Sequence, residues 1–161
     1  MNIKTIILLT IFVTISTSPS IAQWERPTTA YTNAQATSSS EELGVLLNQA
    51  RLQNSRQALT QSEELTRAAQ KHADDMRVKN YFSHTGQNGS SHFQRIKEEN
   101  YTACYTAENI AKGQKTPAAV MNGWMNSKGH RTNNLSTKAK EYGIGRSANI
   151  WVLVFARKCK A

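Results

Sequence analysis

The hydrophobic pattern changes its period along this chain, and that change constrains the fold more than any other feature. The apolar residues of segments 43–50 and 65–76 recur at helical spacing. Near the other end, segments 142–146 and 150–155 are short, apolar and β-prone. Helices early, strands late and no repeating βαβ pattern predict an α+β domain, with helices packed on a mostly antiparallel sheet.

Local signals indicate where the helices begin. Ser39 with Glu42, and Thr60 with Glu63, have capping-box spacing, so ordered structure is expected to begin near Ser39 and a second helix at Thr60. Thr116 precedes a proline, which predicts the start of a later helix.

Weaker signals complete the expected order of elements. A short helix is expected through Arg95 and Ile96, and a strand within residues 101–110. The helix after Thr116 is expected to stop near Gly129, and residues 147–149 are expected to turn a hairpin.

Residues 1–22 have the pattern of an export signal. They carry one charge, an apolar run from Ile6 to Ile15, and small residues before Gln23. The run is too short to span a bilayer, although a retained anchor is the alternative, and no later stretch is long enough. Residues 23–38, rich in Thr, Ser and Ala, are expected to be a flexible leader to a domain over 39–161. The mature protein is therefore expected to be secreted or periplasmic.

The charge balance favours contact with anionic material. The chain has 20 Lys and Arg against 11 Asp and Glu, a formal charge of +9. An anionic cell-envelope surface is one expected partner, and a solvated basic surface without a partner is the plainer alternative. Only Arg157, Lys158 and Lys160 cluster in the sequence. Because no basic helix with interleaved aromatic residues occurs, no nucleic-acid partner is expected.

Two cysteines remain to be explained, Cys104 and Cys159. In an exported chain they most simply form one disulfide. Two free thiols or a redox pair are the alternatives, and the wide spacing without a C-x-x-C sequence argues against the redox pair.

Three of the residues that could carry chemistry are His84, Glu108 and His130. Both histidines lie in glycine-containing polar segments, which usually run over a surface. Glu108 lies in an apolar setting and would need partners there. Two imidazoles and a carboxylate can bind a divalent metal or exchange protons. By contrast, His72 lies on a helical apolar face and is expected to be structural, and His92 is expected to be exposed.

Several segments together resemble the bacterial secreted branch of the CAP superfamily, the SCP/PR-1-like domain. They are HADDM at 72–76, YFSHTG at 81–86, NGSS at 88–91, AENIA at 107–111 and WMNSKGHR at 124–131. Each segment alone is moderately specific, whereas their order and spacing together are strong. The resemblance spans about residues 41–157.

That resemblance implies a three-layer α-β-α sandwich with a central cleft. The family's cleft usually gathers two His and two acidic residues, and His84, Glu108 and His130 match three of them. The fourth position, three residues after Trp124, is Ser127. Since a hydroxyl is a weaker ligand than a carboxylate, the resemblance implies at most weak binding of zinc or another divalent metal.

The sequence favours a secreted binding or interaction module with a polar His/Glu cleft over an enzyme. Its ligand would be a lipid, a partner protein or another envelope component. The alternative is a metal-assisted hydrolase or peptidase that uses the same cleft. Against that alternative, the chain has no H-E-x-x-H helix and no obvious separate base.

Overall fold

The computed structural model describes residues 28–159, with side chains from Ser39 onward. The elements are α1 (Thr28–Gln53), β1 (Thr60–Gln61), α2 (Glu63–Val78), α3 (His92–Glu98), β2 (Ala103–Lys112), α4 (Pro117–Asn126), α5 (Lys128–Asn134), β3 (Glu141–Ser147) and β4 (Ile150–Lys158). The expected signal peptide, 1–22, lies outside the described residues. The division into a leader over 23–38 and a domain over 39–161 stays a prediction.

One four-stranded sheet forms the centre of the molecule, in the order β1-β3-β4-β2. β4 pairs antiparallel with both β3 and β2, whereas the short β1 pairs in parallel with β3. The expected hairpin is confirmed, and Ala148 in its turn has a positive φ of 54°. The sheet is therefore mostly antiparallel, as predicted, and β1 is the strand that the sequence pattern did not reveal.

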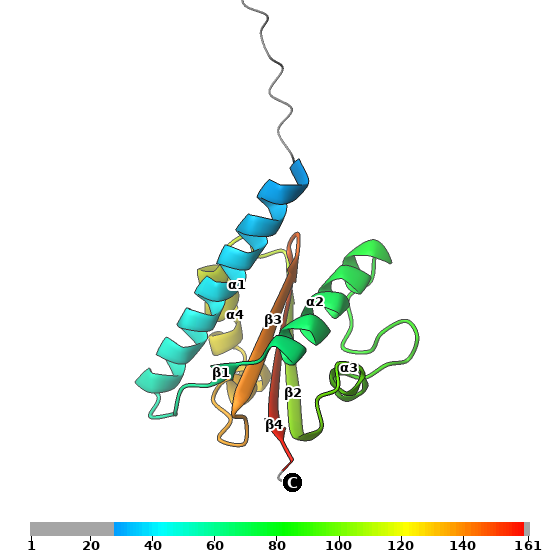
Figure 1. Ribbon diagram of the computed structural model, residues 1–161. Coiled ribbons are helices and arrows are strands. Elements are labelled where there is room, and N and C mark those ends of the chain that lie inside the picture. Colours follow the sequence, from blue (N-terminus) through cyan, green and yellow to red (C-terminus); the bar gives the residue numbers. More distant parts are fainter. Residues whose placement is uncertain (1–27, 160–161) are drawn as a thin grey trace, which may run out of the picture.

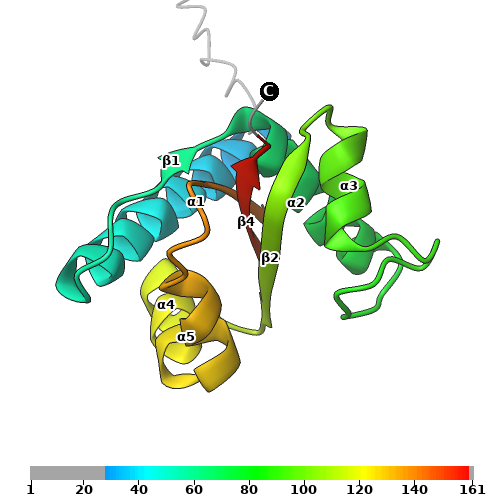
Figure 2. The ribbon, with the colours of Figure 1, turned by 90° about the horizontal axis from the view of Figure 1, so that it is seen from below.

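Helices cover both faces of this sheet (Figure 1). Because successive side chains of a strand point to opposite faces, β4 contributes to two cores. Trp151, Leu153 and Phe155 pack in one core with α1 and α4, and Val152 and Val154 pack in the other with α2 and α3. The expected α+β fold with three α-β-α layers is thus confirmed. Seen from below, α4 and α5 lie on one side of β2 and α3 on the other (Figure 2).

Helix α2 lies against β3 at two glycines. A Cβ on Gly143 would collide with the backbone of Leu65 and Thr66, and a Cβ on Gly145 with the backbone of Ala69 and Gln70. These contacts involve helix backbone rather than a movable side chain, so any larger residue would push the helix off the sheet.

Two predicted helix starts are wrong. α1 begins at Thr28 instead of Ser39, because extending a helix that is already packed is easier than nucleating a new one. Ser62, rather than Thr60, caps α2 by accepting the amide of Leu65, since Thr60 is part of β1.

The expected start of the later helix is confirmed, but its end differs. Thr116 caps α4 by accepting the amide of Ala119 at 3.2 Å. α4 ends at Asn126, and a separate helix, α5, runs through Gly129, where the sequence predicted a stop. That second helix positions part of the candidate site.

Cys104 and Cys159 form the expected disulfide, which links the beginning of β2 to the residue after β4. The amide of Cys159 also donates to Thr102 O at 3.1 Å. The end of the last strand is thus fixed covalently to the middle of the chain. Within residues 28–159, none of the helices has both the length and the apolar character that a membrane span needs.

Candidate functional site

Glu108 is a buried carboxylate in the middle of strand β2. It stands opposite Val154 of β4, and its side chain is only 1% exposed. Burying a charge costs free energy unless partners replace the lost water. Glu108 therefore needs hydrogen-bond or charge partners, as its apolar setting in the sequence predicted.

Two cationic or polar side chains occupy its two oxygens. His84 Nδ1 lies 2.8 Å from Oε1, and Arg95 Nη2 donates to Oε2 at 2.8 Å. Arg95 also donates to the carbonyls of Ser90 and His84, at 2.8 and 3.1 Å. This arginine therefore ties the loop that carries His84 to the carboxylate on the sheet.

These partners decide the charge of Glu108. Burial raises the pKa of its carboxyl, but the hydrogen bond with His84 and the positive charge of Arg95 outweigh burial, so the pKa lies below its ordinary value. Glu108 is therefore an anion at neutral pH, and both of its oxygens are engaged. A carboxylate in that state orients its neighbours and is poorly suited to accept a proton from a substrate.

An open pocket of about 580 Å³ lies beside this carboxylate. Its lining residues are His84, Glu108, Ser127, Lys128, Gly129, His130, Thr132 and Asn133. All four residues that the sequence placed in the cleft line this one pocket. Ser127 is the residue between α4 and α5, and its hydroxyl does not cap the following helix.

Asparagine side chains hold α5, and with it His130, against strand β2. Asn109 Nδ2 donates to His130 O at 3.1 Å and to Asn134 Oδ1 at 2.9 Å. Asn133 Nδ2 donates to Asn109 Oδ1 at 2.9 Å. Asn109 and Asn134 are fully buried, so this network fixes one wall of the pocket.

Several polar atoms at the pocket have no partner among the described residues. They are Nε2 of His84, both ring nitrogens of His130, and Nζ of Lys128, since no hydrogen bond or ion pair of the described part of the chain includes them. Burial and the neighbouring His84 both lower the pKa of His130, which favours a neutral ring at pH 7. The pocket thus presents polar groups to solvent, with Lys128 as its exposed cation.

The other two histidines differ in how well the sequence predicted them. His72 is buried, with Nε2 at 3.0 Å from Ser83 O, so the expected structural role with a backbone partner is confirmed. His92 was expected to be exposed, but it is half-buried beside Arg95 and His84, and burial lowers its pKa.

The three predicted metal ligands do not form a ready-made cluster in this arrangement. Among residues 28–159 no three His, Cys, Asp or Glu side chains form a group that could hold a metal ion. The reason is visible at Glu108, whose oxygens already bond to His84 and Arg95. Metal binding by His84, Glu108 and His130 stays a prediction, and a test is given below.

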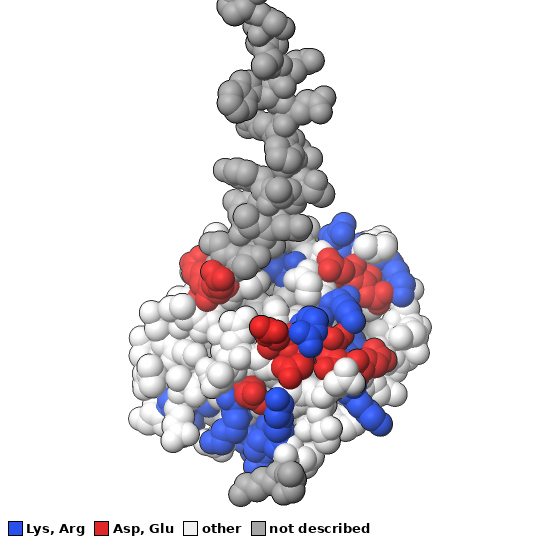
Figure 3. Space-filling model, in the orientation of Figure 1, with Lys and Arg blue, Asp and Glu red and all other residues white. Residues whose placement is uncertain are grey.

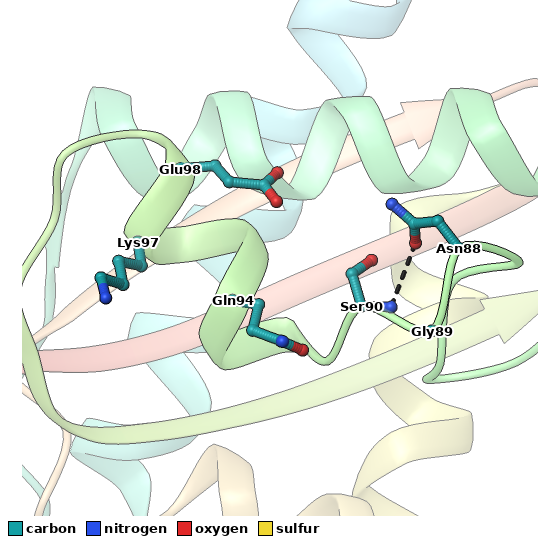
Figure 4. Close-up of a pocket in the computed structure, with 6 residues that line it drawn as sticks. All are labelled: Asn88, Gly89, Ser90, Gln94, Lys97 and Glu98. Atoms are coloured by element: carbon teal, nitrogen blue, oxygen red, sulfur yellow. Dashed lines mark hydrogen bonds between the residues drawn. The ribbon is translucent and has the colours of Figure 1, made fainter.

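A second open pocket, of about 450 Å³, lies beside α3 (Figure 4). It is lined by Asn88, Gly89, Ser90, Gln94, Lys97 and Glu98, and none of the predicted cleft residues takes part. Within it, Ser90 N donates to Asn88 Oδ1 at 3.0 Å, which stiffens the loop whose carbonyl holds Arg95.

Arg95 is the main site residue that sequence reasoning missed. It was recognised as part of a short helix but not as the partner of Glu108, because 13 residues separate them and one arginine carries no motif. A buried glutamate in a basic chain was the available signal, since such a group needs a cation nearby.

Comparisons with known proteins agree with the fold. The family model of the cysteine-rich secretory protein family, CAP, matches residues 46–154. Uncharacterized protein YkwD of Bacillus subtilis (strain 168) is 36% identical over 149 residues, which are 90% of this chain and 57% of that protein. Uncharacterized membrane protein YlbC of the same strain is 28% identical over 122 residues, 76% of this chain and 35% of that protein.

Solved structures give the same result. An extracellular SCP-domain protein from Bacillus anthracis str. Ames matches with a TM-score of 0.75 and 27% identity, over 76% of this chain and 41% of that one. An outer surface protein from Borrelia burgdorferi matches in fold, with a TM-score of 0.69 and 22% identity over 74% of this chain and 92% of that one. The chain spans about a third to just over half of the length of the two Bacillus subtilis relatives. With its family match, its relatives and its three-layer fold in agreement, the chain belongs to the CAP cysteine-rich secretory protein family.

Proposed function

We propose that this chain is an exported binding module, and that the pocket beside Glu108 holds a polar group of its ligand. The ligand would be an envelope component or a partner protein that presents acceptor oxygens to His84, His130 and Lys128. Glu108 and Arg95 would hold His84 in position at the pocket and would take no part in a reaction.

One observation carries the proposal: both oxygens of the carboxylate that lines the pocket are already bonded, while Nε2 of His84, the ring nitrogens of His130 and Nζ of Lys128 have no partner among the described residues. Both oxygens of Glu108 are engaged, and its side chain is 1% exposed. A hydrolase would need a free base or a metal-bound water. A binding site needs only unpartnered polar groups in a concave surface, which is what His84, His130 and Lys128 supply.

The free groups also indicate what the ligand should look like. Lys128 is an exposed cation, and a histidine ring nitrogen can donate a hydrogen bond. A ligand with a phosphate or carboxylate group would complement them, and one with an exposed cation would not. Export rests on the expected signal at residues 1–22 and agrees with the extracellular and outer-surface character of the two structural relatives named above.

Thermal-shift measurements with defined probes test this function. Glycerol 3-phosphate, orthophosphate and acetate would be compared with the uncharged sugar alcohol glycerol. A ligand that binds the native state raises the melting temperature by mass action. We expect the phosphate compounds to stabilise the wild-type protein, and Lys128→Ala or His130→Ala to remove the effect.

Lys115→Ala is the matched control, since Lys115 is also exposed but does not line the pocket. It should respond to the probes like the wild type. A stabilisation that survives both pocket substitutions would place the binding elsewhere and overturn the proposal.

A further inference from the structure

Exposed cations gather at the end of the domain where β4 finishes. We define this basic end as Arg56, Lys138, Lys140 and Arg157, all of which are exposed. The amide of Lys140 donates to Ala156 O at 2.9 Å, next to Arg157. In the space-filling view, Lys and Arg side chains gather over the end of β4, at the lower part of the molecule (Figure 3).

Arg56 is brought to the same end by a backbone contact. Its Nε donates to Leu135 O at 3.1 Å, at the start of the loop that carries Lys138 and Lys140. Residues far apart in the sequence, from the segment after α1, the loop before β3 and the end of β4, therefore build one surface.

A buried arginine adds further positive charge beneath this surface. Arg51 is 1% exposed, and within the described part of the chain it donates only to the carbonyls of Gln57, Asn134 and Ser136. Burial lowers the pKa of Arg51, and the positive charge of neighbouring Arg56 lowers it further. None of the ion pairs among the described residues gives Arg51 a carboxylate partner.

The carboxylates of the described residues that form ion pairs do so away from the basic end. In the described part of the chain, the acidic partners in ion pairs are Glu63, Glu64, Asp75, Glu99 and Glu108, and none of them pairs with Arg56, Lys138, Lys140 or Arg157. Glu141 is the one acidic residue within 135–159, and its carboxylate accepts from Tyr101. None of the four cations of the basic end therefore has an ion-pair partner among the described residues.

We propose that the basic end binds a linear, phosphate-rich polyanion of the cell envelope. Several separate cations on one face suit a chain of repeating anionic groups, because each cation can neutralise one group and release its counterions. Such a contact would be distinct from the pocket, since none of the pocket's lining residues belongs to the basic end. It would hold the module at the envelope while the pocket stays open.

A polymer is favoured over a membrane because the basic end lacks apolar anchors. Membrane-surface binding usually combines cations with inserted apolar side chains. In the described part of the chain, the exposed large apolar residues are Val45, Leu52, Val78, Phe82 and Phe93. Of these, only Leu52 is near the basic end in sequence, and none comes from the loop before β3 or from β4. A partner would thus recognise the basic end by its positive charge alone.

Binding of long-chain inorganic polyphosphate to the full chain tests the proposal. The test variant is Lys138→Gln with Lys140→Gln and Arg157→Gln. The control, Lys97→Gln with Lys112→Gln and Lys115→Gln, removes the same charge from other exposed positions. We expect the wild type to bind with an affinity that falls steeply with salt. The test variant should lose about tenfold or more, with a salt dependence weaker by about one unit of slope per removed cation.

The control variant should stay within about twofold of the wild type, and the single variant Lys138→Gln should show an intermediate loss. An equal loss of polyphosphate affinity in the test and control variants would mean that only the overall charge of the protein matters, and it would overturn the proposal. Tighter binding to phosphatidylserine vesicles or to duplex DNA than to polyphosphate, at equal phosphate concentration and with the same variant dependence, would also overturn it. The test variant, which leaves the lining of the pocket intact, should keep the wild-type thermal shift with glycerol 3-phosphate, so failure of the pocket and failure of the basic end are distinguishable.

Discussion

Arg95 donates from Nη2 to Oε2 of Glu108 at 2.8 Å, and this contact joins two buried charges from α3 and β2. Their side chains are 10% and 1% exposed. His84 bonds to the other carboxylate oxygen of Glu108, Oε1. The position of His84 in the pocket therefore depends on the ion pair between Arg95 and Glu108.

Removing the arginine should therefore be costly. Arg95→Met would leave Glu108 buried without its cation, and we expect a loss of about 3–5 kcal/mol in the free energy of unfolding, measured by urea denaturation. Lys97→Met, on the exposed side of the same helix, should change little. Combining Arg95→Met with Glu108→Gln should recover part of the loss. A loss below about 1 kcal/mol for Arg95→Met would mean that the pair behaves like an exposed one.

The same pair predicts how stability depends on pH. The pKa of Glu108 is lowered in the folded state, so its contribution is fully present above the unfolded value of about 4.3 and is lost as pH falls through the folded pKa. Urea unfolding between about pH 3 and pH 7 should show wild-type stability decreasing below about pH 4.3. The Glu108→Gln variant should decrease less steeply, and an unchanged slope in that variant would contradict the assignment.

The packing of α2 on β3 predicts opposite outcomes for two glycines. Gly143→Ala places a Cβ against the backbone of Leu65 and Thr66, and overpacking of this kind costs about 1–3 kcal/mol. Gly123→Ala is the matched control, because a Cβ there meets nothing within 4 Å and lies in helix α4. It should stabilise the protein by about 0.5–1 kcal/mol, as alanine favours a helix. Equal effects in chemical denaturation would show that α2 does not lie so close.

The disulfide should contribute to stability by restricting the unfolded chain. It closes a separation of 55 residues between Cys104 and Cys159, and replacing both with serine is expected to cost about 2–4 kcal/mol. The measurement is urea unfolding of the oxidised wild type and the double variant. Reduction by dithiothreitol should bring the wild type to the level of the variant, and a wild type that is insensitive to reduction would contradict this account.

Zinc titration separates the binding module from the metal-assisted hydrolase. Since Arg95 and His84 already engage Glu108, we expect calorimetry to show no zinc binding at micromolar concentrations near pH 7. Glu108→Gln should then behave like the wild type toward zinc. Tight binding that is lost in both Glu108→Gln and His130→Ala would support the hydrolase and argue against the proposed function.

Local sequence signals predicted those elements whose boundaries are set locally. Thr116 caps α4 and the turn before Asn149 joins β3 to β4, because capping and turn chemistry act over a few residues. The start of α1 was mispredicted because a packed helix extends easily beyond a local capping signal, and the cap of α2 because both Thr60 and Ser62 could serve. At α2, Thr60 is not the cap because it pairs with β3 as part of strand β1.

The candidate site shows the same division. Motif order predicted that His84, Glu108, Ser127 and His130 belong together, and these four residues line one pocket. The supporting contacts of Arg95 and Asn109 were not predicted, because hydrogen bonds between distant segments leave no periodic trace in a single sequence. The basic end was missed for a similar reason, as its cations come from three separate segments.

The central claim is that ligands enter the pocket beside Glu108, and nuclear magnetic resonance titration tests it most directly. Glycerol 3-phosphate would be added to ¹⁵N-labelled protein while backbone amide and histidine ring signals are followed. The account predicts saturable shifts concentrated at residues 127–133 and at the ring of His84, which weaken in Lys128→Ala. Shifts confined to the second pocket, around residues 88–90, or to the basic end would contradict it.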